Sequence, residues 1–113
     1  MRKTDKKLDN TLRVSLTRVC ETALEEVAGF KWLTHLVNFS DFSESLRVVC
    51  VFESDTELNN AKSNNQDKHL RDLIKQELET AGIKLKNISK QISFDTEEQC
   101  ELQNNGRWSN RLQ

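Results

Sequence analysis

The chain has no proline, no tyrosine and only three glycines among its 113 residues. Phosphate-binding loops of the GxxxxGK[ST] and GxGxxG types need clustered glycines, whereas Gly29, Gly82 and Gly106 are far apart. Aromatic residues make up 6% of the chain, which disfavours a base-stacking surface for single-stranded nucleic acid. No apolar run approaches membrane-spanning length, and no apolar segment follows the basic residues 1–7, so we expect a cytoplasmic protein without a secretory signal.

The three cysteines are also informative by their arrangement. Cys20, Cys50 and Cys100 are widely spaced, with no CxxC motif and no Cys/His cluster. A disulfide framework or a zinc site needs closer spacing. We therefore expect buried free thiols in a reducing compartment, and we predict neither a metal nor a cofactor.

No catalytic constellation is recognisable. The only histidines, His35 and His69, lie in an apolar strand-like run and in a basic helical segment, with no local signature linking either to a nucleophile. The carboxylate pairs at 25–26 and 97–98 are adjacent in helical segments, so their side chains point about 100° apart. The formal net charge of −1 gives no overall basic character. We predict that the protein is not an enzyme.

Apolar spacing predicts two long helices, at about 6–28 and 67–81. Each ends just before a glycine, and a third short helix at 96–104 also ends near one, as expected of residues that cap helix C-termini. Asp95 is the predicted N-cap of the short helix. The apolar stripes are formed by Leu8, Leu12, Leu16, Val19, Ala23 and Val27, widened by Cys20 and Leu24, and by Leu70, Leu73, Ile74, Leu78 and Ala81.

Alternating apolar residues predict strands at 32–39 and 46–52. Val49 and Val51 occupy the second parity of the later strand, so this strand is either covered on both faces or lies at a partner interface. Residues 83–94 fit a third strand with a bulge, or alternatively a helix.

The resulting order is α-β-β-α-β-α, an α+β fold with a three-stranded antiparallel or mixed sheet packed on two long helices. We predict one domain over residues 1–113, with frayed ends at 1–5 and 109–113. Residues 54–66 are expected to form a mobile loop. The capping-box spacing of Ser54 and Glu57 predicts one helical turn at its start. Trp108, in a polar tail, either docks the C-terminus onto the core or anchors a partner.

Three lysines form a second candidate site. Lys84, Lys86 and Lys90 have the same parity around the third strand, where they line one face and form a small basic patch. A solvated strand face is the simpler interpretation, and contact with nucleic acid is the alternative.

Several stretches resemble a family of short, uncharacterised gammaproteobacterial proteins. They are residues 1–7 and 29–35, and the segments LRVVCVF, FDTEEQC and GRWSNRL. Some similar proteins are labelled Fis-family transcriptional regulators. That label implies an all-helical fold ending in a helix-turn-helix, with residues 84–92 as the nearest counterpart of its recognition helix. The element order is also similar to RNA-binding domains of the KH type, although the GxxG loop is missing.

Our leading hypothesis is a non-enzymatic cytosolic interaction or regulatory module, with self-association through the strand at 46–52 as one form of it. Val49, Val51 and Trp108 are the candidate partner-binding residues. The alternative is a nucleic-acid-binding protein that uses Lys84, Lys86 and Lys90.

Overall fold

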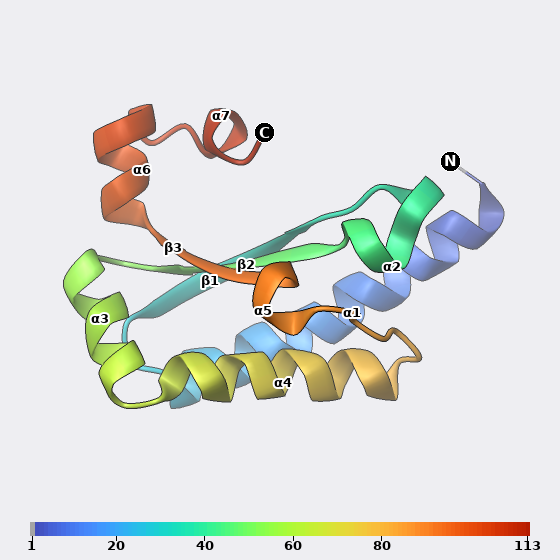
Figure 1. Cartoon of the computed structure of the whole chain (residues 1–113), viewed down its shortest axis with the longest axis horizontal. Helices are drawn as coiled ribbons and strands as arrows, with labels where there is room; N and C mark the ends of the chain where they lie inside the picture. Colours follow the sequence, from blue (N-terminus) through green and yellow to red (C-terminus); the bar gives the residue numbers. More distant parts are fainter. Residues whose placement is uncertain (1) are drawn as a thin grey trace.

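A computed structural model describes residues 2–113. Its three strands, β1 (Phe30–Leu36), β2 (Arg47–Phe52) and β3 (Ile92–Thr96), form one sheet in the order β1-β2-β3. β1 is antiparallel to β2, and β3 is parallel to it, so the sheet is mixed. Helices cover this sheet, as Figure 1 shows, and the predicted α+β class is confirmed.

Two long helices lie side by side on one face of the sheet, α1 (Lys3–Glu26) and α4 (Gln66–Thr80) (Figure 1). Most residues of their apolar stripes are buried as the spacing predicts, because residues three and four apart share one side of a helix, and Leu8, Cys20, Leu73 and Ala81 at the margins are half-buried. Leu24 is an exception: it is 55% exposed and does not widen the stripe. The core between helices and sheet includes Leu12, Leu16, Val19, Leu70, Ile74, Leu78, Val48, Cys50, Phe52 and Ile92.

All three glycines adopt positive φ, which confirms their prediction as helix stops. Gly82 shows the reason most clearly. Its N–H donates to the carbonyl of Glu79, and the next N–H, of Ile83, donates back to Leu78. This closing turn needs a left-handed residue, which only glycine adopts at little cost.

The loop expected at 54–66 is mostly helical. α3 (Asp55–Ser63) begins where the Ser54 side chain accepts a hydrogen bond from the Glu57 N–H, as the capping spacing indicates. The helix continues further than one turn because Leu58 and Ala61 are buried against the core. The prediction of a mobile loop was therefore wrong for most of this segment.

Residues 83–94 contain less strand than expected. Residues 83–87 form a loop, α5 (Ile88–Gln91) is one helical turn, and only the segment from Ile92 is strand. The buried Gln91 explains the break, since its side-chain amide donates to the carbonyls of Ser43 and Leu46. Those carbonyls belong to the connection between β1 and β2, which contains η1 (Phe39–Asp41) and α2 (Phe42–Ser45).

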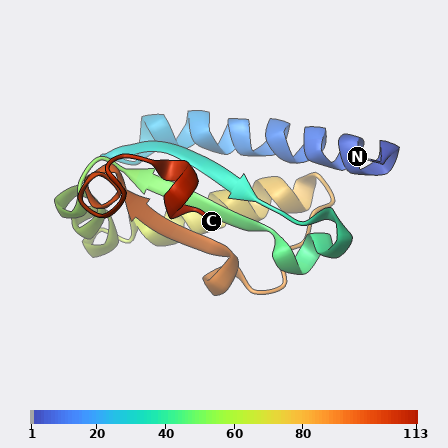
Figure 2. The ribbon, with the colours of Figure 1, turned by 90° about the horizontal axis from the view of Figure 1, so that it is seen from above.

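The C-terminal segment lies on the opposite, outer face of the sheet, as Figures 1 and 2 show. α6 (Glu97–Asn104) follows β3, and α7 (Trp108–Arg111) folds back over the strands. The N-cap of α6 is Thr96, whose hydroxyl accepts from the Gln99 N–H, and not Asp95 as predicted. Asp95 instead points to the outer face, where it pairs with Arg111.

β2 is enclosed on every side. Both of its edges are hydrogen-bonded, to β1 and to β3. On its outer face Val49 and Val51 are 3% and 0% exposed. The expectation that this strand is covered on both faces is confirmed. Self-association stays a prediction, but β2 offers it neither a free edge nor a free face.

Candidate functional site

An acidic groove opens at the end of the sheet where β2 and β3 both terminate. Its volume is about 510 Å³. The lining comes from the β2–α3 junction, from α6 and from the start of the C-terminal turn, namely Glu53, Ser54, Glu97, Glu98, Glu101, Gly106 and Trp108. Four of these seven residues are glutamates, and none is basic. We call this feature the acidic groove.

The parallel pairing of β2 with β3 brings these glutamates together. Phe52 lies opposite Thr96 in the register, so the chain leaves both strands at the same level. The N–H of Glu98 donates to the carbonyl of Glu53 at 3.3 Å. The Glu98 carboxylate in turn accepts from the backbone N–H of Asp55 at 2.9 Å. Glu53 and Glu98 therefore share one rim of the groove despite their separation in the sequence.

The negative charge of the groove is only partly balanced. Lys31 pairs with Glu53 at 3.0 Å, but both side chains are half exposed, and this contact raises the pKa of the lysine. Such an exposed pair is weak and easily exchanged. Glu101 is exposed and has no ion-pair partner among residues 2–113. The groove thus keeps net negative charge that a cation can satisfy.

Trp108 forms the aromatic wall of the groove. Its ring packs edge-on against Trp32 of β1, with 4.8 Å between ring centroids and 82° between planes. Its indole N–H donates to the Glu97 carboxylate at 2.6 Å. Trp108 therefore docks the C-terminus onto the sheet, which was one of the two alternatives for this residue. The half-buried ring also lines the groove.

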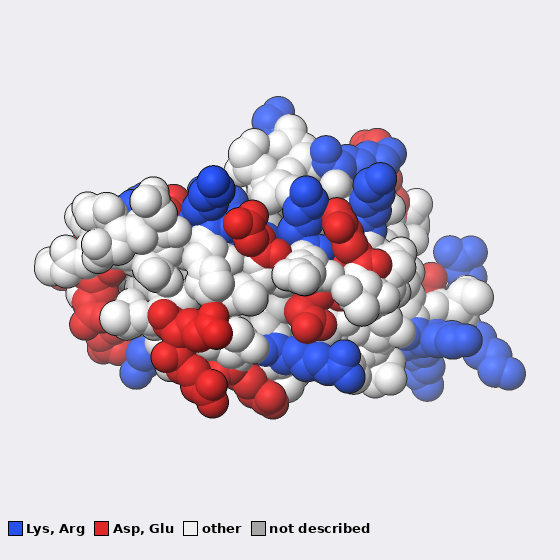
Figure 3. All heavy atoms as spheres, turned by 90° about the horizontal axis from the view of Figure 1, so that it is seen from below, with Lys and Arg blue, Asp and Glu red and all other residues white. Residues whose placement is uncertain are grey.

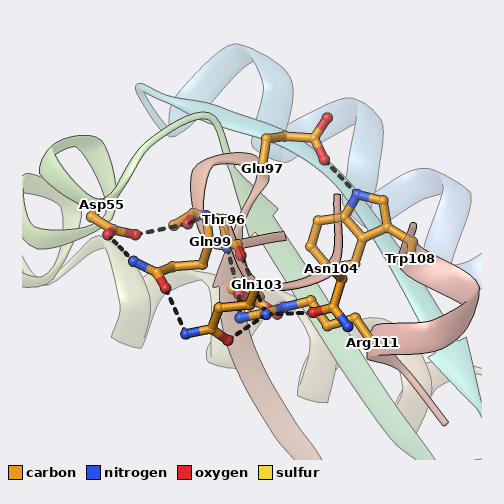
Figure 4. Close-up of polar contacts among 9 residues, drawn as sticks. Asp55, Thr96, Glu97, Gln99, Gln103, Asn104, Trp108 and Arg111 are labelled. Carbon is orange, nitrogen blue, oxygen red and sulfur yellow. Dashed lines mark hydrogen bonds and ion pairs between the residues drawn. The ribbon is translucent and has the colours of Figure 1, made fainter. Parts of the chain in front are cut away.

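A polar network beside the groove fixes α6 in place (Figure 4). Asp55 accepts hydrogen bonds from the Thr96 hydroxyl and the Gln99 amide, which tie α3 to α6. These two donors stabilise the carboxylate form and lower the pKa of Asp55. Gln103 donates to Gln99 and accepts from Arg111, so the network extends to α7. The groove is therefore built on a braced scaffold.

The other predicted partner-binding residues are inaccessible. Val49 and Val51 are buried in β2 and touch no open surface. The groove glutamates form no motif in the sequence, because Glu53 is distant from the other three and neighbouring carboxylates on a helix point apart. The order of the elements contains a signal for them. A helix between β2 and β3 is typical of parallel strands, and parallel neighbours end at the same edge of the sheet.

The three lysines do not form one patch. Lys86 pairs with Glu44 at 2.9 Å, which raises its pKa, and lies near Lys90 in a shallow hollow. Lys84 lines a different hollow, beside Glu79. On the helix face, Figure 3 shows Lys and Arg interspersed with Asp and Glu. Nucleic-acid binding stays a prediction, without a continuous basic surface on this face to support it.

The histidines and cysteines give no second site. His35 Nε2 lies 3.7 Å from the Asp9 carboxylate, and His69 contacts Glu26 at 2.7 Å between α4 and α1. No group of three or more His, Cys, Asp or Glu side chains within residues 2–113 is arranged to hold a metal ion. In the same described range, no helix is both long and apolar enough to cross a bilayer.

Comparisons with protein-family models, curated proteins and solved structures found no match to this chain. The resemblance to short gammaproteobacterial proteins therefore stays a prediction. The all-helical fold implied by the regulator label differs from the observed sheet. Within residues 84–92 only the single turn of α5 is helical, which is too short for a recognition helix.

Proposed function

We propose that this protein is an interaction module that binds a basic segment of a partner polypeptide in the acidic groove. One observation carries the proposal: Glu53, Glu97, Glu98 and Glu101 line one groove together with Trp108, and no basic residue lines it. Lysine and arginine side chains suit such a surface, because carboxylates attract them and an indole face adds cation–π attraction.

The form of the groove favours a peptide as the ligand. The glutamates come from the β2–α3 junction and from successive turns of α6, so the charge is spread along a rim. An extended segment with several basic residues can contact such a rim at several points. The Lys31–Glu53 pair is exposed enough for an incoming cation to replace Lys31.

A titration with a labelled peptide tests this function. The probe is a fluorescein-labelled decapeptide of alternating lysine and serine, and its control replaces every lysine with glutamine. We expect fluorescence anisotropy to detect binding of the lysine peptide that weakens as salt is added, because the attraction is electrostatic. The glutamine peptide should not bind.

Matched charge variants locate the site. The double variant Glu53→Gln/Glu101→Gln should weaken binding by about tenfold, or about 1.4 kcal/mol. The control is Glu21→Gln/Glu25→Gln, which removes the same charge from exposed positions on α1. Equal weakening by both doubles would show charge attraction without a site. No binding at low salt would also refute the proposal.

A further inference from the structure

The outer face of the sheet carries a three-residue row that the chain itself covers. In the strand register Trp32 of β1 lies beside Val51 of β2, and Val51 lies beside Asp95 of β3. The row therefore presents an aromatic ring at one end, an aliphatic centre and a carboxylate at the other end. Neighbouring strands are about 4.8 Å apart, so the two ends are separated by about 10 Å.

Two side chains of residues 105–113, which we call the C-terminal strap, contact the two ends of this row. Trp108 packs edge-on against Trp32. Arg111 donates two hydrogen bonds to Asp95, at 2.6 and 2.9 Å. Between these contacts Val51 is fully buried. Trp108 and Arg111 are three residues apart on α7, and this spacing places them on the same side of one helical turn.

The strap owes its structure to these contacts. α7 has four residues, and a single helical turn is unstable in isolation because nucleation is unfavourable. Its link to α6 passes through Asn105 and Gly106, which both have positive φ. The strap is therefore a separate docking element, joined to the body by a sharp turn. It is held by the Trp108–Trp32 contact and the forked Arg111–Asp95 pair, and also by bonds to α6: the Trp108 indole N–H donates to Glu97, and Arg111 donates to Gln99, Gln103 and Asn104.

We propose that the row formed by Trp32, Val51 and Asp95 is a recognition site for a helical turn with tryptophan and arginine three residues apart. In the resting chain the strap occupies this site as an intramolecular ligand. A second polypeptide with the same Trp-x-x-Arg turn makes the same contacts when it displaces the strap. This site is distinct from the acidic groove, although the tryptophan of the bound turn lines that groove.

The covalent link between the strap and the rest of the chain determines when a second polypeptide can displace the strap. A short tether gives the strap an effective concentration in the millimolar range, so it outcompetes a dilute ligand that has equal contacts. A partner displaces the strap when it makes additional contacts, or when the contacts of the strap with the row are weakened. Weakening the strap without changing the row is therefore the way to reveal the site.

The test uses the full chain with Arg111→Ala, which removes the forked ion pair and the Arg111 contacts to α6, and leaves the row residues Trp32, Val51 and Asp95 unchanged. The probe is a fluorescein-labelled peptide of residues 105–113, NGRWSNRLQ. We expect it to bind this variant at least tenfold more tightly than the wild-type chain, measured by fluorescence anisotropy. Peptides with alanine in place of the tryptophan, or of the arginine at position 111, should bind at least tenfold more weakly.

A scrambled peptide of the same composition separates this inference from the proposed function. If the scrambled and native peptides bind equally, charge alone explains the binding, and the recognition site is refuted while the acidic groove stands. Equal binding of the native peptide to the variant and to the wild type also refutes it, as does no binding to a folded variant. If circular dichroism shows that Arg111→Ala is unfolded, Arg111→Lys replaces it, since lysine keeps the charge and loses the fork.

Discussion

Arg111 binds Asp95 through a two-pronged contact, in which Nε donates to one carboxylate oxygen and Nη2 to the other. Both side chains are less than one-fifth exposed, at 16% and 19%. The pair joins the last helical turn of the chain to the edge strand β3, and Asp95 is the main reason that the pKa of Arg111 is raised. This ion pair holds α7 against the outer face of the sheet.

A double-mutant cycle should measure this contact. We expect Arg111→Ala and Asp95→Ala to show a coupling free energy of about 1–2 kcal/mol in urea unfolding, because both partners are largely shielded and the geometry is bidentate. The control is the Arg13–Asp9 pair on α1, whose arginine is 68% exposed. Its coupling should be about 0.3–0.5 kcal/mol. Equal couplings in the two cycles would contradict a structural role for the Arg111 pair.

Val51 tests whether the outer face is covered in solution. Val51→Ala should lower the free energy of unfolding by about 1–2.5 kcal/mol, because Val51 is fully buried and its truncation leaves a cavity. Val14→Ala removes the same atoms from a residue that is 45% exposed on α1, and should change stability by less than about 0.5 kcal/mol. Similar small effects at both positions would mean that the strap leaves Val51 accessible.

The two long helices and β2 were predictable because their apolar residues repeat at regular intervals. Leu12, Leu16 and Val19 are buried at helical spacing, and Val48 and Cys50 at strand spacing. The helix α3 was missed beyond its first turn because only Leu58 and Ala61 of its nine residues are buried. A helix stabilised by so few tertiary contacts leaves a weak pattern in the sequence.

The candidate site was less predictable, because the third strand was ambiguous. Residues 88–91 alternate like a strand, yet they form one helical turn. The last residue of this turn, Gln91, is buried and its side-chain amide donates to the carbonyls of residues 43 and 46. Contacts that distant in the chain are not visible in local periodicity. The order of the elements indicates that β2 and β3 end at the same edge, but without the limits of β3 its register could not be placed, and so the pairing of Glu53 with Glu98 in particular could not be derived.

Asp55 should make stability depend on pH in acid. Its pKa is lowered from 3.8, first by the hydrogen bond from Gln99 and then by that from Thr96. A carboxyl with a lower pKa in the folded state stabilises the protein above its unfolded pKa, and this contribution is lost as the pH falls through the folded pKa. Asp55→Asn should therefore be less stable than the wild type at neutral pH.

The difference between the two proteins in melting temperature should shrink as the pH falls below 3.8, the ordinary pKa of this carboxyl. Asp72→Asn, at an exposed position on α4, serves as the control and should follow the wild type throughout. A stability difference at Asp55 that stays constant down to about pH 2 would show that its charge is not the stabilising feature.

The cysteines should differ in reactivity. Cys50 and Cys100 are fully buried, and burial raises the pKa of both thiols, that of Cys50 to about 12, so neither forms the reactive thiolate at neutral pH. Burial also raises the pKa of Cys20, but this residue is only half-buried and lines a surface hollow that a reagent can enter. Iodoacetamide at about pH 8 should therefore label only Cys20 in the native protein, and all three cysteines in urea, by mass spectrometry. Cys20→Ser should remove the native labelling, and labelling of Cys50 in folded protein would contradict the packed core.

Two glycines with the same backbone conformation should respond differently to a methyl group. Gly29 and Gly82 have φ of 84° and 83°, so alanine strains the backbone equally at both. At Gly82 an added Cβ meets nothing within 4 Å, and we expect a loss of about 1 kcal/mol. At Gly29 the added Cβ lies only 2.8 Å from the Cβ of Glu57, which α3 holds in place, so the loss should reach about 2 kcal/mol or more. Equal losses in urea unfolding would mean that α3 moves away from Gly29 freely, and therefore that the α3 end of the acidic groove is not rigid.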